Sequence, residues 1–305
     1  MRLTTKDDYV MKKYEYSGMS SVFYPALDQI ADKNTGIFGP VSFLDYLSGL
    51  EFPKLKAPDA ISIDSWERLH QSLKDNDTMV LRLGKSTGAG TQFALVKIKD
   101  KLNEYFLFDE QIFTDQGVEY IPEVEDTQLL AYRLLPTLTE TSVVNLGFTS
   151  GLISKALHLD EVIPIFPPAT CNSTFTFTFK PHSSLDTEVT HNNGQVEIDA
   201  MFVSKRNGVD TLFVVEAKMG STHKSLAKHK LLYPVLAVAP QIPEHIPIVP
   251  VYLKVQRTTR GIHFHVAECE VPDSRKRRVG YDELKLKRYT HYIFPSQLLE
   301  YEQKR

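Results

Sequence analysis

Hydrophobic residues follow strand-like patterns through most of the second half of the chain. STFTFTFK (173–180) alternates strictly between polar and apolar residues, which predicts a strand with one buried face. VEIDAMFVS (196–204) and TLFVVEAK (211–218) are more uniformly apolar, as expected of strands buried on both faces of a sheet. IPIVPVYLKV (246–255) and IHFHVAEC (262–269) predict two further strands. The second half is therefore predicted to contain an extended sheet.

Two segments with helical spacing flank the first three of these strands. ETSVVNLGFTSGLISKALHLDE (140–161) predicts one or two helices before the first strand. THKSLAKHKLLYPVLAV (222–238) predicts a helix after the third strand. This order of helix, three strands, helix and further strands is typical of an α/β fold with a mixed sheet flanked by helices.

The N-terminal third of the chain mixes helix and strand patterns. Apolar residues at helical spacing predict helices at 41–50 and 62–77. Apolar runs bounded by turn residues predict strands at 78–84, 91–99 and 105–113. These elements predict a domain of the α+β type.

The boundary between the two parts is expected near Pro136, inside the candidate connection IPEVEDTQLLAYRLLPTL (121–138). A length of 305 residues exceeds that of one typical domain. The sequence therefore predicts an N-terminal α+β domain at 1–135, with recognition as its candidate role, and a second domain at 136–305.

The glycine-rich loop GKSTGAG (84–90) joins two of the predicted strands. A phosphate-binding Walker loop has Lys-Ser/Thr after its last glycine, whereas Lys85 and Ser86 precede Gly88 and Gly90 here. We predict a hairpin turn, with contact to ligand phosphates as a minor alternative.

Composition is that of an ordinary globular protein. Hydrophobic residues make up 42% and charged residues 24% of the sequence, which allows a sizeable core. There is no run of about 18 apolar residues to predict a membrane span, and the start MRLTTKDDYVMKKYEY lacks the apolar stretch of a secretory signal. Two cysteines, Cys171 and Cys269, are too few for a disulfide framework, so a reducing cytoplasm is the expected compartment.

Charge is distributed unevenly along the chain. Residues 1–135 carry a net charge of −6 and residues 136–305 a net charge of +3. Much of the positive excess lies in one run: Arg275, Lys276, Arg277 and Arg278. Most such runs are solvated loops, and contact with nucleic-acid phosphates is the functional alternative.

The pair Asn207-Gly208 between two apolar strands is a strong signal for a hairpin with a two-residue type I′ turn. In that register the numbers of cross-strand partners add up to 415, which places Asp199 opposite Glu216. Because side chains alternate between the faces of a strand, four charged residues project from one face. They are Glu197, Asp199, Glu216 and Lys218.

Two carboxylates in an otherwise apolar hairpin need compensation, because opposed like charges about 5 Å apart are destabilising. A hard divalent cation such as Mg²⁺ provides it, since this ion takes oxygen ligands from one or two carboxylates, water and substrate phosphate. Lys218 would lie beside the same ion, where it could orient a water molecule or offset negative charge. These roles suit metal-assisted hydrolysis of a phosphodiester. The alternative is a solvent-facing hairpin edge with a surface ion pair between Glu197 and Lys218.

These residues resemble the PD-(D/E)XK nuclease superfamily, which includes restriction endonucleases and archaeal Holliday-junction resolvases. Asp199 within E-I-D matches the first acid of its motif, and Glu216-Ala217-Lys218 matches (D/E)-X-K. The resemblance covers about residues 138–255 and implies a restriction endonuclease-like core of a helix, a meander of strands and a second helix. It also implies that Asp199, Glu216 and the backbone carbonyl of Ala217 hold Mg²⁺, with Mn²⁺ as a substitute.

The sequence departs from the pattern of the superfamily at two positions. Ile198 stands where the proline of the motif would be, and Lys230 stands where some members carry a glutamine before Tyr-Pro. Some members also use an acid on the first helix, for which Glu140 is the candidate; at a first helical turn it could instead interact with the helix dipole. Three lysines near the second helix are candidates for phosphate contacts, with a solvated helix face as the alternative: Lys224, Lys228 and Lys230.

The resemblance implies a cytoplasmic Mg²⁺-dependent nuclease, most simply a DNA endonuclease of the restriction or defence type. Water would attack the phosphodiester directly, with no covalent intermediate on the enzyme. Double-stranded DNA is the expected partner, a homodimer is one option for the assembly, and no membrane is involved. The alternative function is that of a catalytically inactive nuclease-fold protein that only binds nucleic acid.

A transition-metal site is a further alternative elsewhere in the chain. His263, His265 and Cys269 share one face of a predicted strand. Only three ligands of loose spacing are present, and histidines on a half-exposed strand are far more common, so this interpretation is given little weight.

Overall fold

The computed structural model describes residues 19–33, 36–50, 55–88, 90–122, 124–135, 137–161, 167–221 and 224–296. Several positions discussed above lie outside these ranges: the N-terminal segment 1–18, Ala89 of the glycine-rich loop, Pro136, and Thr222 and His223. None of the helices within the ranges has the length and apolar character that a membrane crossing requires.

Twelve strands are present in the described ranges, and ten of them form one large mixed sheet. Its order is β1-β3-β2-β7-β8-β10-β11-β12-β5, and β6 is also paired with β7, whereas β4 and β9 form a separate pair. The strands are β1 (Ile37–Ser42), β2 (Thr78–Lys85), β3 (Thr91–Lys97), β4 (Phe106–Phe108), β5 (Val118–Glu119), β6 (Ala169–Phe179), β7 (Val189–Arg206), β8 (Val209–Met219), β9 (Ser225–Ala227), β10 (Ile248–Thr258), β11 (Gly261–Glu270) and β12 (Lys285–Pro295).

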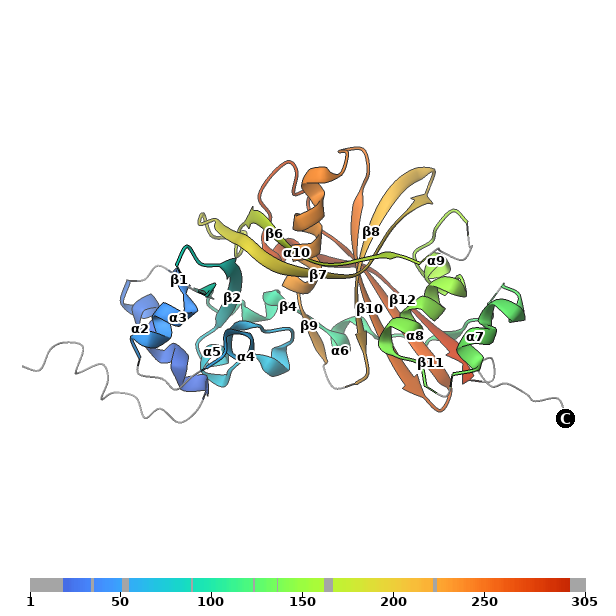
Figure 1. Ribbon diagram of the computed structural model, residues 1–305, viewed down its shortest axis with the longest axis horizontal. Helices are drawn as coiled ribbons and strands as arrows, with labels where there is room; N and C mark the ends of the chain where they lie inside the picture. The colour runs from blue at the N-terminus through green and yellow to red at the C-terminus, as the bar shows by residue number, and fades with distance from the viewer. Residues whose placement is uncertain are drawn as a thin grey trace, which may run out of the picture.

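Helices flank this sheet, and the mixed α/β class predicted from the sequence is confirmed (Figure 1). The α-helices are α2 (Tyr24–Lys33), α3 (Phe43–Ser48), α4 (Ala57–Ile61), α5 (Gln71–Lys74), α6 (Asp109–Ile112), α7 (Leu130–Arg133), α8 (Glu140–Thr149), α9 (Leu152–Ala156) and α10 (His229–Val238). Short 3₁₀ helices are η1 (Met19–Phe23), η2 (Trp66–Arg68), η3 (Leu102–Tyr105), η4 (Asp126–Leu129), η5 (Ala239–Gln241) and η6 (Tyr281–Glu283).

The central hairpin of β7 and β8 has the predicted register. Its pairs run from Arg206↔Val209 at the turn to Ala200↔Val215. Asn207 and Gly208 have φ angles of 53° and 75°, as a type I′ turn requires. The register follows from local chemistry, because few residue pairs adopt two positive φ angles in succession.

The two faces of the central strands are covered by different helices. Residues of α8 and α9 share a hydrophobic core with Phe213, Val215 and Ala217 of β8. Residues of α10 share a second core with Leu212 and Val214 of β8. Because side chains alternate along a strand, Glu216 and Lys218 project from the face that α10 covers.

Strands from before residue 136 pair with strands from after it. β2 meets β7 at Gly84↔Asn192, β4 pairs with β9, and β5 pairs with β12. Gly84 has a φ of 80°, and a Cβ atom there would lie 2.3 Å from the carbonyl oxygen of Asn192. Only glycine allows this approach. The two halves of the chain therefore share sheet hydrogen bonds across the expected boundary.

Helix α10 is shorter than predicted. The sequence predicted a helix over 222–238, but the helix begins at His229, and Ser225–Ala227 form strand β9. β9 pairs with β4, from more than a hundred residues earlier in the chain. This distant partner has no signature in the local pattern, so the helix prediction was wrong for residues 225–228.

The N-terminal elements also differ from the predicted ones. The strand predicted at 105–113 ends at Phe108 and continues as α6, and the helix predicted at 62–77 is reduced to η2 and α5. The helix predicted at 41–50 is α3 over Phe43–Ser48, because Ser42 ends β1 and its side chain accepts a hydrogen bond from the Asp45 N–H. The loop at 84–90 joins the antiparallel strands β2 and β3, as predicted for a hairpin.

Candidate active site

Asp199 lies at an irregularity in β7. The pairing of β6 with β7 shifts there, because Ala169 pairs with Met201 whereas Cys171 pairs with Ile198. One extra residue on β7 makes this a β-bulge, a feature that often redirects a side chain beside a functional site. The Asp199 carboxylate accepts a hydrogen bond through Oδ2 from the backbone N–H of Ala217, with a distance of 2.8 Å. The bulge thus directs Asp199 towards the E-A-K segment of β8.

Glu216 is almost completely buried, with 2% of its surface exposed. Its Oε1 atom lies 2.7 Å from Lys218 Nζ and 3.4 Å from Lys230 Nζ. Its Oε2 atom is also buried and has no hydrogen-bond partner in the described ranges. Burial raises the pKa of Glu216 to about 7; the Asp199 charge also raises it, whereas the two lysines oppose the shift. Glu216 is therefore close to its protonation midpoint at neutral pH.

Lys218 and Lys230 approach Glu216 from different elements. Lys218 is the last residue of the E-A-K segment, and Lys230 is the second residue of α10. Burial lowers the pKa of each lysine, but the neighbouring carboxylates, Glu216 foremost, together outweigh burial and both pKa values are raised. Lys230 Nζ also lies 3.7 Å from the Glu197 carboxylate. We refer to Glu197, Asp199, Glu216, Lys218 and Lys230 as the acid–lysine cluster.

The oxygen atoms of this cluster fit a hard divalent cation. Glu216 Oε2 is a buried carboxylate oxygen without a partner, and such atoms are rare in proteins. Asp199 Oδ1 accepts no hydrogen bond from the described residues, because only Oδ2 is bound to the Ala217 N–H. Two carboxylates from adjacent strands are the protein contribution that Mg²⁺ usually receives.

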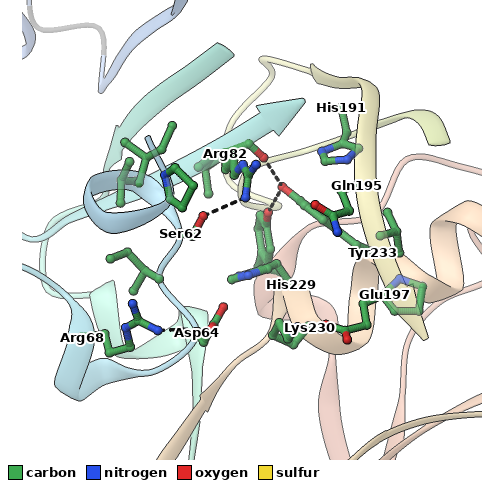
Figure 2. A pocket seen from close by; sticks show the side chains of 18 of the residues that line it. Ser62, Asp64, Arg68, Arg82, His191, Gln195, Glu197, His229, Lys230 and Tyr233 are labelled. Carbon is green, nitrogen blue, oxygen red and sulfur yellow. Dashed lines mark hydrogen bonds and ion pairs between the residues drawn. The ribbon is translucent and has the colours of Figure 1, made fainter. Parts of the chain in front are cut away.

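A cavity of about 360 Å³ adjoins the cluster (Figure 2). Glu197 and Lys230 belong to its lining, which joins the N-terminal region to β7 and α10. Polar and aromatic residues line most of it: Ser62, Asp64, Arg68, Arg82, His191, Gln195, His229, Tyr233 and Tyr281. The size lies within the usual range for ligand pockets.

Arg82 is the cation of this cavity that has no carboxylate partner in the described part of the chain. Its Nη1 atom donates a hydrogen bond to Ser62 Oγ at 2.9 Å, whereas Arg68 pairs with Asp64 at 3.7 Å. His229 lies next to Lys230, and burial lowers its pKa to about 4, so its ring is neutral at pH 7. Arg82 is therefore positioned to bind an anion that enters the cavity.

Residues 101–293 match a family described as a domain of unknown function (DUF6997). The chain belongs to this family. The match covers more than half of the 305 residues and includes the whole acid–lysine cluster. It begins after Arg82, so the cavity combines residues from inside and outside the DUF6997 region. No curated protein matches the sequence.

Glu140 is not brought into the cluster. It is exposed in the first turn of α8, the helix that covers the opposite face of the sheet from Glu216. Arg257 at the end of β10 donates to the carbonyl of Leu138, so Glu140 lies towards the same end of the sheet as the cluster. Its carboxylate forms no hydrogen bond or ion pair within the described ranges.

The three lysines predicted to contact phosphate have different surroundings. Lys230 belongs to the acid–lysine cluster, and Lys224 is exposed directly before β9. Lys228 is only 7% exposed, and burial lowers its pKa to about 8. The alternative of a solvated helix face does not hold for Lys228, because this residue precedes α10 in a buried turn, where its N–H donates to the Tyr105 carbonyl.

The basic run at 275–278 is largely neutralised by neighbouring groups. Arg275 binds Asp273 at 2.7 Å and also donates to four backbone carbonyls, of Ile242, Pro243, Glu244 and Ile246. Arg277 pairs with Glu283, Arg278 with Glu188, and Lys276 with Asp273. Arg275 holds the loop before β10, at the opposite end of this strand from the residues beside Lys218. The structure therefore does not place this run beside the acid–lysine cluster, and its contact with nucleic acid stays a prediction.

Sequence reasoning missed Arg82 as a site residue. One signal was available, because Arg82 is the only charged residue in the apolar run TMVLRLG of β2. Its partner Ser62 and the opposing residues of β7 and α10 come from distant parts of the chain. The position of the cavity therefore depends on tertiary structure.

Proposed function

We propose that this protein is a Mg²⁺-dependent nuclease with a restriction endonuclease-like core. One observation carries the proposal: a buried Glu216 oxygen without a partner lies in a cluster with Asp199, Lys218 and Lys230. A buried carboxylate oxygen without a hydrogen-bond partner lowers the stability of the folded state. A bound cation offsets that cost.

Asp199 and Glu216, with the carbonyl of Ala217, would hold the ion. When bound, Mg²⁺ supplies electrostatic stabilisation of the negative charge on the phosphate. Lys218 lies within 2.7 Å of Glu216, where its ammonium group orients a water molecule for attack and offsets charge in the transition state. Lys230 bridges the cluster to the cavity and binds the phosphate backbone beside the cleavage point.

The order of elements supports the restriction endonuclease-like core. Helices α8 and α9 are followed by the meander β6-β7-β8, by the short strand β9, by α10 and by β10, which is parallel to β8. This is the helix, meander and helix order that the resemblance implies.

The cavity supports nucleic acid as the substrate. Arg82 provides a guanidinium group for a phosphate, and the aromatic and amide groups of Tyr233 and Gln195 suit a nucleotide. Since residues of the N-terminal region line this cavity, we assign that region a role in recognition. Double-stranded DNA is the substrate we propose.

The test is the conversion of supercoiled plasmid to nicked or linear DNA. The full chain is incubated with Mg²⁺, with Mn²⁺ and with EDTA, and a Lys276→Ala variant serves as the control. We expect cleavage with either ion and none with EDTA, and an unchanged rate for the control. Metal-independent cleavage, or none with either ion, would contradict the proposal.

A second function is favoured by the two lysines themselves. Lys218 and Lys230 already balance the Glu216 charge without an ion, as they would in a nuclease-fold protein that only binds nucleic acid. Such a protein would bind DNA without cleaving it, and Mg²⁺ would not raise its melting temperature. Thermal unfolding with and without Mg²⁺ separates the two functions.

A further inference from the structure

Three histidines converge on neighbouring strands of the sheet, away from the acid–lysine cluster. His263 and His265 lie on β11, and His291 lies opposite His265 on β12. One ring nitrogen from each lies within 4.8 Å of those of the other two. His265 and His291 are buried, and His263 is half-buried.

One nitrogen of each ring is held by a neighbouring group. His291 Nδ1 donates to the carbonyl of Asp115 at 2.9 Å. His263 Nε2 bonds to Thr258 Oγ1 at 2.9 Å, and His265 Nδ1 bonds to the Tyr289 hydroxyl at 2.8 Å. Outer hydrogen bonds of this kind fix the orientation of histidines that bind metals.

The other three nitrogens lack such partners outside the group. His263 Nδ1 and His291 Nε2 form a hydrogen bond with each other at 2.9 Å, which an ion bound by both nitrogens would replace. His265 Nε2 is buried and has no hydrogen-bond partner in the described part of the chain. A buried polar atom without a protein partner is rare, and a bound water molecule, ligand or ion accounts for it.

We propose that His263, His265 and His291 form a site for a divalent transition metal ion, and that this ion is Zn²⁺. Imidazole nitrogens suit this class of ion, whereas Mg²⁺ prefers oxygen. Nitrogens bound to tetrahedral Zn²⁺ lie about 3.3 Å apart, close to the observed 2.9 Å between His263 and His291. The His265 ring stacks on His291 with 4.0 Å between centroids, and one of its nitrogens lies within 4.8 Å of the ligand nitrogens of the other two histidines.

The site is separate from the acid–lysine cluster. Lys218 lies beside Lys254 on β10, which lies beside His265 on β11. Neighbouring strands are about 4.8 Å apart, so two strand spacings, or about 10 Å, separate Lys218 from His265. One ion cannot be shared over that distance.

The metal would fix the segment 113–119 to the edge of the sheet. Phe113 stacks on His265 with ring centroids 4.7 Å apart, and Asp115 accepts the hydrogen bond from His291. Gly117 approaches His291 so closely that a Cβ atom there would lie 2.6 Å from its ring. The same segment continues into β5, which pairs with β12.

Zinc titration of the untagged, EDTA-treated full chain tests the proposal. Isothermal calorimetry is expected to show about one Zn²⁺ per chain, and Co²⁺ is expected to give the visible absorption of a tetrahedral site. His263→Gln and His291→Gln should each weaken binding at least about tenfold. His263 is half-buried, so its variant keeps the fold, which circular dichroism verifies.

Two controls make the result specific. His245→Gln changes an exposed histidine outside the group and should leave Zn²⁺ affinity unchanged. Asp199→Asn should also leave it unchanged, which separates this site from the proposed nuclease site. If the wild type does not bind Zn²⁺, or if His245→Gln loses as much affinity as His263→Gln, the proposal is overturned.

Discussion

The Asp199 carboxylate accepts a hydrogen bond from the backbone N–H of Ala217, the residue between Glu216 and Lys218. The regular pairs of β7 and β8 end at Ala200↔Val215, so a side chain satisfies a backbone donor just beyond them. This hydrogen bond therefore links the bulge in β7 to the segment of β8 that carries Glu216 and Lys218.

Two substitutions of Asp199 are expected to distinguish the contribution of this hydrogen bond to stability from the contribution of Asp199 to cation binding. Asn retains an oxygen acceptor, so Asp199→Asn should change the free energy of unfolding by less than about 1 kcal/mol while abolishing the Mg²⁺-induced rise in melting temperature. Asp199→Ala leaves the Ala217 N–H without its acceptor and should lose about 1–3 kcal/mol. Urea unfolding measures both. Equal losses in the two variants would show that the hydrogen bond does not stabilise the fold.

The raised pKa of Glu216 predicts a pH-dependent stability. Its pKa is about 7 in the folded protein and 4.5 for an ordinary glutamate, so between these pH values the folded state binds more protons than the unfolded state. Stability from this group therefore falls as pH rises through that window, by up to roughly 3 kcal/mol. We expect wild type to lose more stability than Glu216→Gln between pH 5 and pH 8, as measured by urea unfolding. If the free energy of unfolding changes equally with pH in both proteins, Glu216 does not cause the pH dependence.

Lys218→Ala is expected to affect the reaction more than ion binding. The ammonium group is proposed to offset charge in the transition state, and the loss of one such group typically costs about 100- to 1000-fold in rate. Mg²⁺ should still raise the melting temperature of this variant. Single-turnover cleavage and thermal unfolding measure the two effects. A variant with full cleavage activity would exclude Lys218 from the reaction.

Arg82→Gln is expected to weaken DNA binding through the cavity. Loss of one phosphate contact should lower the slope of log affinity against log salt by about one. Arg277→Gln is the matched control, because Arg277 is already paired with Glu283. Fluorescence anisotropy at several salt concentrations gives both slopes. If Arg277→Gln lowers the slope and Arg82→Gln does not, the DNA path runs over the 275–278 loop.

The hairpin could be predicted from the sequence because its information is local. Asn207 and Gly208 fix the turn and the pairs from Arg206↔Val209 to Ala200↔Val215, whereas the predicted pair Asp199–Glu216 lies just beyond them. The bulge at Asp199 could not be predicted, because it depends on how β6 pairs with β7. The same limit applies to β9, whose partner β4 is distant in the chain.

The positions of charged and metal-binding side chains were harder to predict than the strands. A run of four basic residues suggested a phosphate site, but only the fold shows that carbonyls and carboxylates surround Arg275. Lys230 was expected on a phosphate-binding helix face, and it lies against Glu216. His263 and His265 were visible as a pair, whereas their neighbour in space is His291 and not Cys269.

The plasmid cleavage rate over a Mg²⁺ titration tests whether the acid–lysine cluster hydrolyses phosphodiesters with a bound Mg²⁺ ion. Wild type and Asp199→Asn are compared at equal protein concentration. We expect a cleavage rate that rises with Mg²⁺ and saturates in wild type, with no cleavage above background in Asp199→Asn. Equal cleavage by both proteins, or none by wild type at any Mg²⁺ concentration, would contradict it.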